Sequence, residues 1–148
     1  MSLENTINEA IKTAMREKDK VALDSLRAVK AQILLLKSEA KGADVSPEQE
    51  IAIVQRMIKQ RKDSFEQFTA QGRNDLAEVE EAQMKVIEQF LPKQLSAEEL
   101  EAEIKNIISE TGAESMKDLG KVMGVASKTL AGKSDGKSIS ETAKRLLS

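Results

Sequence analysis

The chain has 148 residues, 40% hydrophobic and 32% charged, a composition typical of one soluble domain or two small ones. It contains neither Cys nor His, which excludes disulfides, thiol chemistry, cysteine metal sites and the most common general base. With no Trp or Tyr and only three Phe, side chains that stack on nucleic-acid bases are scarce.

The net charge of −2 is distributed unevenly. Between Lys117 and Ser148 seven basic residues outnumber three acidic ones, whereas between Pro92 and Met116 six acidic residues outnumber two basic ones. A local basic patch attracts anionic partners even on an acidic molecule. No apolar run approaches the length of a membrane span and no signal-peptide pattern is present, so we expect no membrane contact and a cytoplasmic location.

Apolar residues recur at intervals of three and four through almost the whole chain, which predicts an all-α protein. Four helices are predicted in the N-terminal part: Leu3–Lys18, Lys20–Lys41, Pro47–Gln71 and Asn74–Leu91. The third follows a strong start signal, in which Ser46 and Gln49 form a capping box around Pro47. Leu23, Leu34 and Leu35 widen the apolar stripe of the second helix, which indicates contacts with more than one neighbour, and Val79 of the fourth helix is expected to point inward.

Arg61 stands where the apolar stripe of the third helix requires a hydrophobic residue. Either its stem packs along the helix while the guanidinium reaches solvent, or the guanidinium is partly buried against a carboxylate. We favour the carboxylate, and the candidates across the predicted hairpin are Glu80 and Glu81. Arg61, Arg73 and Glu80 are assigned a structural or interaction role.

Leu91-Pro92 must end the fourth helix, because proline disfavours the helical conformation in the residue before it. Ser96 and Glu99 then form a second capping box. We place a domain boundary here, with an N-terminal four-helix domain at 1–92 and a small three-helix domain at 93–148. Its predicted helices are Ala97–Thr111, Met116–Ala131 and Gly136–Leu147. Their thin core predicts marginal stability for this domain alone.

The helix predicted over Met116–Ala131 concentrates lysine and glycine on one face, opposite its apolar stripe. Four residues share that face at helical spacing: Lys117, Lys121, Gly124 and Lys128. A glycine between lysines lets another molecule approach the backbone, although Gly120 and Gly124 could instead permit close helix packing. Because a glycine within a helix costs about 1 kcal/mol relative to alanine, we expect something to use it.

Gly132-Lys133-Ser134 resembles part of a phosphate-binding loop, but the upstream glycine and the preceding strand of a P-loop are missing. The loop can still offer backbone N–H groups to a phosphate at the start of the last helix, beside Lys133 and Lys137. A glycine stop, an Asp135 cap and solvated lysines explain the same residues equally well.

No nucleophile–base pair can be assembled without His, and a Ser–Lys pair at Ser127-Lys128 is better explained by capping. No loop of regularly spaced aspartates suggests a calcium site. We therefore predict no catalytic residue, no metal and no cofactor.

Five short motifs in order along the chain resemble the YqeY family of small bacterial proteins (GatB/YqeY-like). They are Arg61-Lys62-Asp63-Ser64, Gly72-Arg73-Asn74-Asp75-Leu76-Ala77, Leu91-Pro92-Lys93-Gln94-Leu95-Ser96, Leu119-Gly120-Lys121-Val122-Met123-Gly124 and Gly132-Lys133-Ser134-Asp135-Gly136. The family usually has methionine where Leu119 stands and often alanine where Ser134 stands. Both departures are conservative.

That family is similar to the C-terminal tail of the B subunit of the glutamine-dependent aspartyl/glutamyl-tRNA amidotransferase, in which a helical tail binds the body of the tRNA. The resemblance implies a two-part helical fold and tRNA-related binding. It carries over no catalytic residue, because the kinase-like and amidase parts of that enzyme have no counterpart here. The label of carbon–nitrogen ligase with glutamine as amido-N-donor therefore describes the relatives better than this chain.

The leading hypothesis is a non-catalytic tRNA- or RNA-binding accessory protein whose contacts go to phosphates and 2′-hydroxyls. The residues proposed to make them are Lys117, Lys121, Gly124, Lys128, Lys133 and Lys137. The second hypothesis is a protein–protein adaptor whose basic face docks on an acidic partner, such as an amidotransferase or a synthetase. The third is an enzyme subunit that partners complete.

Overall fold

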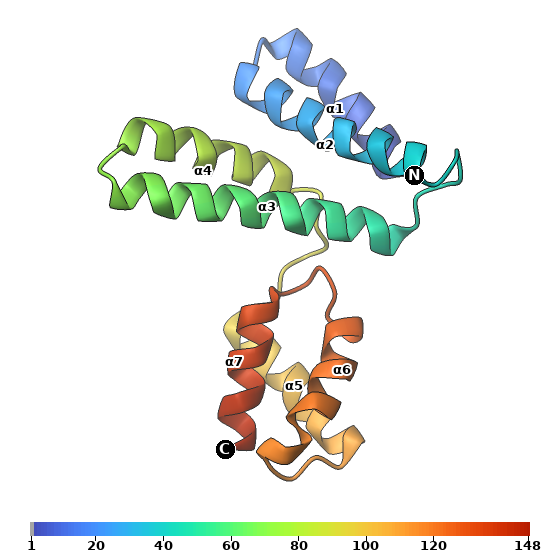
Figure 1. The fold of residues 1–148 in the computed structure, drawn as a ribbon, viewed down its shortest axis with the longest axis vertical. Coiled ribbons are helices and arrows are strands. Elements are labelled where there is room, and N and C mark those ends of the chain that lie inside the picture. Colours follow the sequence, from blue (N-terminus) through green and yellow to red (C-terminus); the bar gives the residue numbers. More distant parts are fainter. Residues whose placement is uncertain (1) are drawn as a thin grey trace. The chain divides into compact units, whose positions relative to one another are not determined.

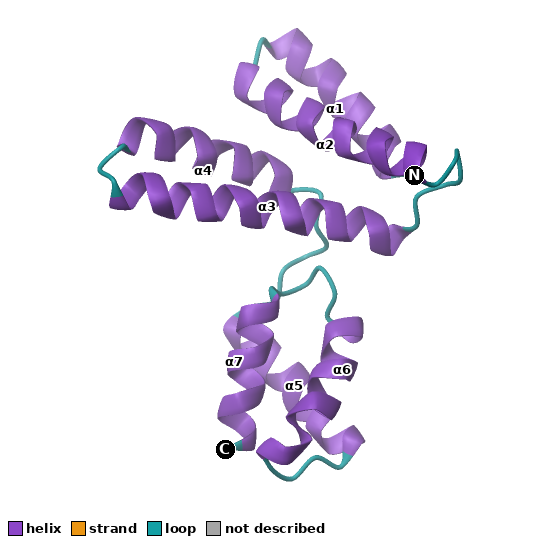
Figure 2. Cartoon of the chain, viewed as in Figure 1, coloured by secondary structure: helices purple, strands orange, loops and turns teal. Residues whose placement is uncertain are grey.

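A computed structural model describes residues 2–148, which form seven α-helices and one 3₁₀ helix and contain no strand (Figures 1 and 2). The prediction of an all-α protein is confirmed. The chain divides into two compact units, Met1–Leu91 and Pro92–Ser148.

The first unit consists of two antiparallel helical hairpins (Figure 1). Its helices are α1 (Leu3–Glu17), α2 (Lys20–Glu39), α3 (Pro47–Ala70) and α4 (Asn74–Glu88). Helix α2 packs on the other three, and the shared core is closed to solvent. Its most completely buried side chains are Ile7, Leu26, Val29, Ile33, Val54 and Ile87.

Local signals define where these helices begin and end. The capping box before α3 is confirmed, since Ser46 Oγ accepts from the Gln49 N–H at 3.2 Å and Gln49 Oε1 accepts from the Ser46 N–H at 2.9 Å. Helix α4 ends at Glu88, three residues earlier than predicted. The reason is that the N–H groups of Phe90 and Leu91 bond three residues back, which tightens the last turn.

Five large apolar side chains in the described part of the first unit are exposed, namely Met15, Val21, Leu34, Leu35 and Val79. Val79 of α4 is 47% exposed, so the expectation that it points inward is wrong. Leu34 and Leu35 of α2 are 47% and 54% exposed. The expectation that α2 contacts more than one neighbour is confirmed, since it packs on α1, α3 and α4 and Leu23 lies against the core, but Leu34 and Leu35 remain largely exposed.

The second unit is a bundle of three α-helices, in which α5 lies behind α6 and α7 in Figure 1. Its helices are α5 (Ala97–Thr111), η1 (Met116–Asp118), α6 (Leu119–Thr129) and α7 (Gly136–Leu147). The bounds of α5 and α7 agree with prediction. The core residues are Leu100, Ile104, Ile107, Val122, Ala126, Leu130, Ile139, Ala143 and Leu147.

The helix predicted over Met116–Ala131 is shorter than expected and begins with a 3₁₀ turn. Ser115 Oγ accepts from the Lys117 N–H at 3.4 Å, and Asp118 Oδ2 accepts from the Glu114 N–H at 2.9 Å. These side-chain bonds satisfy the backbone before the α-helix starts, so the turn stays tight. At the other end the chain leaves α6 at Leu130 and turns at Gly132, whose φ is +77°.

Candidate nucleic-acid interface

Helix α6 separates an apolar inner face from a basic outer face. Val122 and Ala126 are fully buried on the inner face. Lys121, Gly124 and Lys128 are exposed, and their spacing of three and four residues places them together on the outer face. The structure thus brings together three of the six residues predicted for RNA contact.

Lys117 lies in η1 and not in the α-helix. It is exposed, and it stands two positions before Leu119, the first residue of α6. The prediction of one continuous helical face from Lys117 to Lys128 is therefore wrong in its first member, because η1 winds more tightly than an α-helix. Lys117 extends the basic region from a different backbone geometry.

Gly124 leaves the middle of the outer face of α6 without a side chain. A Cβ built at Gly124 would have no heavy atom within 4 Å, and the same holds for Gly120. The alternative that these glycines permit close helix packing is therefore wrong. Since a helical glycine costs about 1 kcal/mol relative to alanine, Gly124 reduces the stability of α6 with no packing inside the unit to compensate.

Lys133 and Lys137 follow α6 in the turn and in the first turn of α7. Both are exposed. The Lys133 N–H donates to the Leu130 carbonyl at 2.9 Å, so the turn continues directly from the end of α6. Asp135 occupies the N-cap position of α7, but its side chain accepts no hydrogen bond from the helix, so the predicted aspartate cap lacks its bond. We call Lys117, Lys121, Gly124, Lys128, Lys133 and Lys137 the lysine surface.

The lysines of the lysine surface have no carboxylate partner within 4.0 Å in the described part of the chain. On α5, by contrast, Glu101 pairs with Lys105 at 3.3 Å and with Arg145 of α7 at 3.5 Å. The hydrogen bonds from Arg145 and Lys105 hold the pKa of Glu101 below its ordinary value of 4.5. The basic groups of α6 and the turn thus remain available to an external anion.

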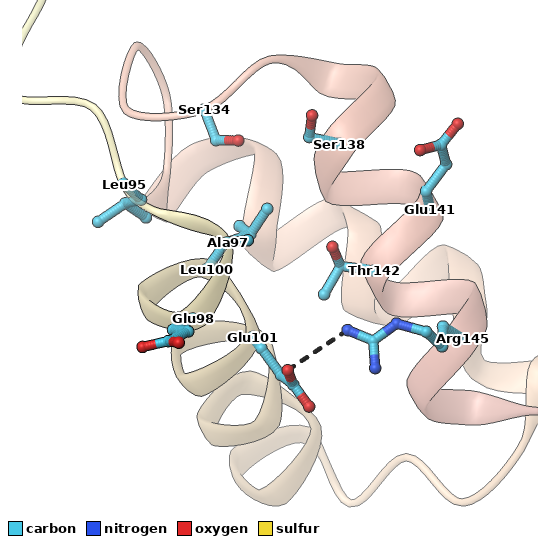
Figure 3. A pocket seen from close by; sticks show the side chains of 10 residues that line it. All are labelled: Leu95, Ala97, Glu98, Leu100, Glu101, Ser134, Ser138, Glu141, Thr142 and Arg145. Carbon is cyan, nitrogen blue, oxygen red and sulfur yellow. Dashed lines mark ion pairs between the residues drawn. The ribbon is translucent and has the colours of Figure 1, made fainter.

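A pocket of about 340 Å³ between α5 and α7 was missed from the sequence (Figure 3). The apolar part of its lining consists of Leu95, Ala97 and Leu100. The ion pair between Glu101 of α5 and Arg145 of α7 also lines the pocket. Its other polar lining residues are Glu98, Ser134, Ser138, Glu141 and Thr142. Ser138 and Thr142, four residues apart, indicate a polar face on α7, and Ser134 lies in the turn before it, but the spacing does not show that α5 closes a pocket over this face.

Arg61 of the first unit is half-buried, but its partners differ from those predicted. Its Nε donates to Gln83 Oε1 at 3.2 Å and its Nη1 donates to the Met57 carbonyl at 3.2 Å. Neither Glu80 nor Glu81 lies within 4.0 Å of it, and Glu81 pairs with Lys85 at 3.1 Å. The predicted carboxylate partner is therefore wrong: Arg61 joins α3 to α4 through the neutral amide of Gln83, and its bond to Met57 stays within α3.

Arg73 precedes α4 and holds Asp75 through two hydrogen bonds of 3.2 Å each. These bonds, together with backbone N–H groups, lower the pKa of the Asp75 carboxyl. Both side chains are more than half exposed, so this pair contributes little to stability. Arg73 organises the turn between α3 and α4.

Residues 2–148 contain neither a candidate metal site nor a candidate membrane span. No three His, Asp or Glu side chains gather as metal ligands. No helix combines the length and the apolar character that crossing a bilayer demands.

The fold and the surface define a class of small helical protein with a basic face on its second unit. The family model described as Yqey-like protein matches residues 4–147. The chain belongs to the YqeY family.

The similar curated proteins include three named "Altered inheritance of mitochondria protein 41, mitochondrial". That of Lachancea thermotolerans is 29% identical over 106 residues, which cover 70% of this chain and 57% of the relative. That of Meyerozyma guilliermondii is 36% identical over 59% of this chain and 45% of the relative. That of Pyrenophora tritici-repentis is 30% identical over 83% of this chain and 68% of the relative. The chain thus spans about half the length of the first two, and these relatives are fungal, so the family is not confined to bacteria.

Proposed function

We propose that the second unit binds structured RNA, tRNA foremost, through the lysine surface, and that the protein acts as a non-catalytic accessory factor. The observation that carries this proposal is the outer face of α6, where lysines without carboxylate partners flank an exposed helix backbone at Gly124. Lysines attract phosphates irrespective of sequence, and the bare backbone leaves room for a phosphate–sugar chain to approach.

The resemblance of the YqeY family to the tRNA-binding tail of the amidotransferase B subunit supports the same proposal. It supplies no catalytic residue, so amide transfer is not part of what we propose for this chain. The names of the fungal relatives refer to mitochondrial inheritance and to no ligand. Cytoplasm and mitochondrial matrix both contain tRNA, and we propose that the protein works in such a compartment.

The experiment is a titration of the full chain with a tRNA transcript at several salt concentrations. The logarithm of the association constant should fall steeply with the logarithm of salt, by about 0.7 to 0.9 for each phosphate contacted. Lys121→Glu should weaken binding, and Lys62→Glu, with the same charge change on an exposed lysine of α3, should have little effect. Absent or salt-independent binding by the parent chain would count decisively against the proposal.

The second candidate is a protein–protein adaptor whose lysine surface docks on an acidic partner, such as an amidotransferase or a synthetase. The exposed Leu34 and Leu35 on α2 favour it, because adjacent large apolar side chains on a surface suit a protein partner better than RNA. A pull-down that captures the same partner after complete nuclease treatment would favour the adaptor over the RNA-binding protein.

A further inference from the structure

Two of the sequence motifs meet in the second unit, although about 40 residues separate them. The Gln94 side-chain amide donates to the Gly132 carbonyl at 2.5 Å and to the Pro92 carbonyl at 2.9 Å. The Leu95 N–H donates to the Lys133 carbonyl at 2.9 Å. We call these three bonds the clasp. The bonds to Gly132 and Lys133 fasten the segment before α5 to the turn between α6 and α7, and the bond to Pro92 lies within that segment.

The backbone of Lys133 is fixed from both sides, by the clasp and by a bond to the end of α6. Its N–H is bonded to Leu130 and its carbonyl accepts from Leu95, while Gly132 holds the preceding left-handed conformation. The Lys133 side chain nevertheless remains exposed. An exposed lysine on a fixed backbone loses less freedom on binding than one on a mobile loop, so a phosphate contact there is stronger.

Core stability does not explain the Gln94 amide. Gln94 is exposed and takes no part in the apolar core, whereas the neighbouring Leu95 packs against that core and anchors the segment. The bond from Gln94 to the buried Gly132 is itself only partly buried, and a single hydrogen bond of this kind contributes modestly to folding because it replaces bonds to water. The main effect of the Gln94 amide is therefore to fix the local conformation of the turn that contains Lys133.

We propose that Gln94 is a positioning residue of the lysine surface: it holds the Gly132–Ser134 turn so that Lys133 meets a phosphate of bound RNA. The inference rests on the proposed function. The clasp also couples two parts of the unit. RNA bound at Lys133 should restrain the Lys133 carbonyl, which accepts the hydrogen bond from the Leu95 N–H. Coupling of this kind is reciprocal, so RNA binding should protect the Leu95 amide from solvent.

A double-mutant cycle tests whether Gln94 acts through Lys133. The parent, Gln94→Ala, Lys133→Ala and the double variant are titrated with a tRNA transcript at several salt concentrations. Each single change should weaken binding about 3- to 10-fold and reduce the salt slope by about one, the signature of one lost phosphate contact. The double variant should bind about as tightly as the weaker single variant, since both changes remove the same contact.

Gln89→Ala is the matched control. Gln89 is also exposed, and its side-chain amide donates to the Val86 carbonyl at 2.8 Å in the first unit. This variant should bind like the parent. Hydrogen exchange of the parent provides a readout without substitution, in which the Leu95 amide should exchange more slowly after tRNA is added.

The outcomes separate the two proposals. If the parent does not bind tRNA, the proposed function is overturned and this inference with it. If Lys133→Ala weakens binding while Gln94→Ala binds like the parent, or if the two losses add, only the positioning role is overturned. Unchanged exchange of the Leu95 amide in the tRNA complex overturns the coupling even where Gln94→Ala alters the fold.

Discussion

Helices α5 and α6 contribute to the same small core but differ on the faces that point away from it. Leu100, Ile104 and Ile107 of α5 pack against Val122 and Ala126 of α6 in one cluster. The outer face of α5 is acidic and its Glu101 holds two cations, whereas the outer face of α6 carries unpaired lysines around glycine. Burial accounts for both inner faces and ion pairing for part of the outer face of α5. No contact inside the unit explains the lysines and the glycine on the outer face of α6. We therefore propose that this face binds a ligand.

The largest effect should come from the inner faces that the two helices share. Ile104 is fully buried, and Ile104→Ala removes core volume at a cost of about 2–5 kcal/mol. A unit of this size has little more stability than that, so it should unfold. Thermal unfolding followed by circular dichroism measures the loss. Ile108→Ala, at a half-buried position of the same helix, should cost less, and equal losses would contradict the assignment of the core.

Reversing charge on the outer face of α6 should have the next largest effect, on binding alone. Lys121→Glu combined with Lys128→Glu should reduce tRNA affinity by about 100-fold at low salt, because two phosphate contacts become repulsions. Its helical content should equal that of the parent. The control is Lys59→Glu combined with Lys62→Glu on exposed positions of α3. A similar loss in this control would show that net charge, and not the lysine surface, governs binding.

Substitution of Gly124 in α6 should move stability and binding in opposite directions. Gly124→Ala should stabilise the second unit by about 0.5–1 kcal/mol, since alanine favours the helix and its Cβ meets open space. Gly124→Glu should abolish RNA binding and leave the fold intact. Gly132→Ala is the contrasting control and should destabilise, because its φ of +77° disfavours any Cβ. A lower melting temperature for Gly124→Ala would show that the glycine serves the fold.

The smallest effect concerns the ion pairs of α5 and depends on pH. The pKa of Glu101 is lower in the folded chain than its ordinary value of 4.5, so its pairs stabilise the fold above that pH and are lost as pH falls through the folded pKa. Glu101→Gln should therefore melt slightly below the parent at pH 7, and the difference should vanish towards about pH 2. Salt at about 1 M should also reduce the difference by screening. A difference that persists in acid would exclude the ion pairs as its cause.

Features governed by neighbouring residues were predictable from the sequence. The helical class, the bounds of α5 and α7 and the capping box at Ser46 follow from periodicity and from signals within four residues. The basic outer face of α6 follows from the same periodicity. The 3₁₀ turn was missed because Ser115 and Asp118 both bond the backbone there, and their competition with an α-helical start cannot be weighed from spacing alone.

Features that depend on the rotation of packed helices were not predictable. Arg61 bonds Gln83 and neither of the predicted candidates Glu80 and Glu81, although Gln83 stands only one helical turn from Glu80 on α4. The pocket between α5 and α7 and the clasp at Gln94 join segments about 40 residues apart. Only the packing of the bundle brings these groups together. The sequence shows each residue but not which distant residue it contacts.

Because the space around Gly124 is open, substitutions at position 124 should be tolerated by the fold but not by RNA binding. In a saturation screen that scores protein abundance, position 124 should behave as a neutral surface site, with alanine slightly enriched. In a parallel screen that scores RNA retention, almost every substitution there should be depleted. The gap between the two scores should be wide at codon 124 and should extend to the codons for Lys121 and Lys128, so the pair of screens would outline the functional surface without a bound complex.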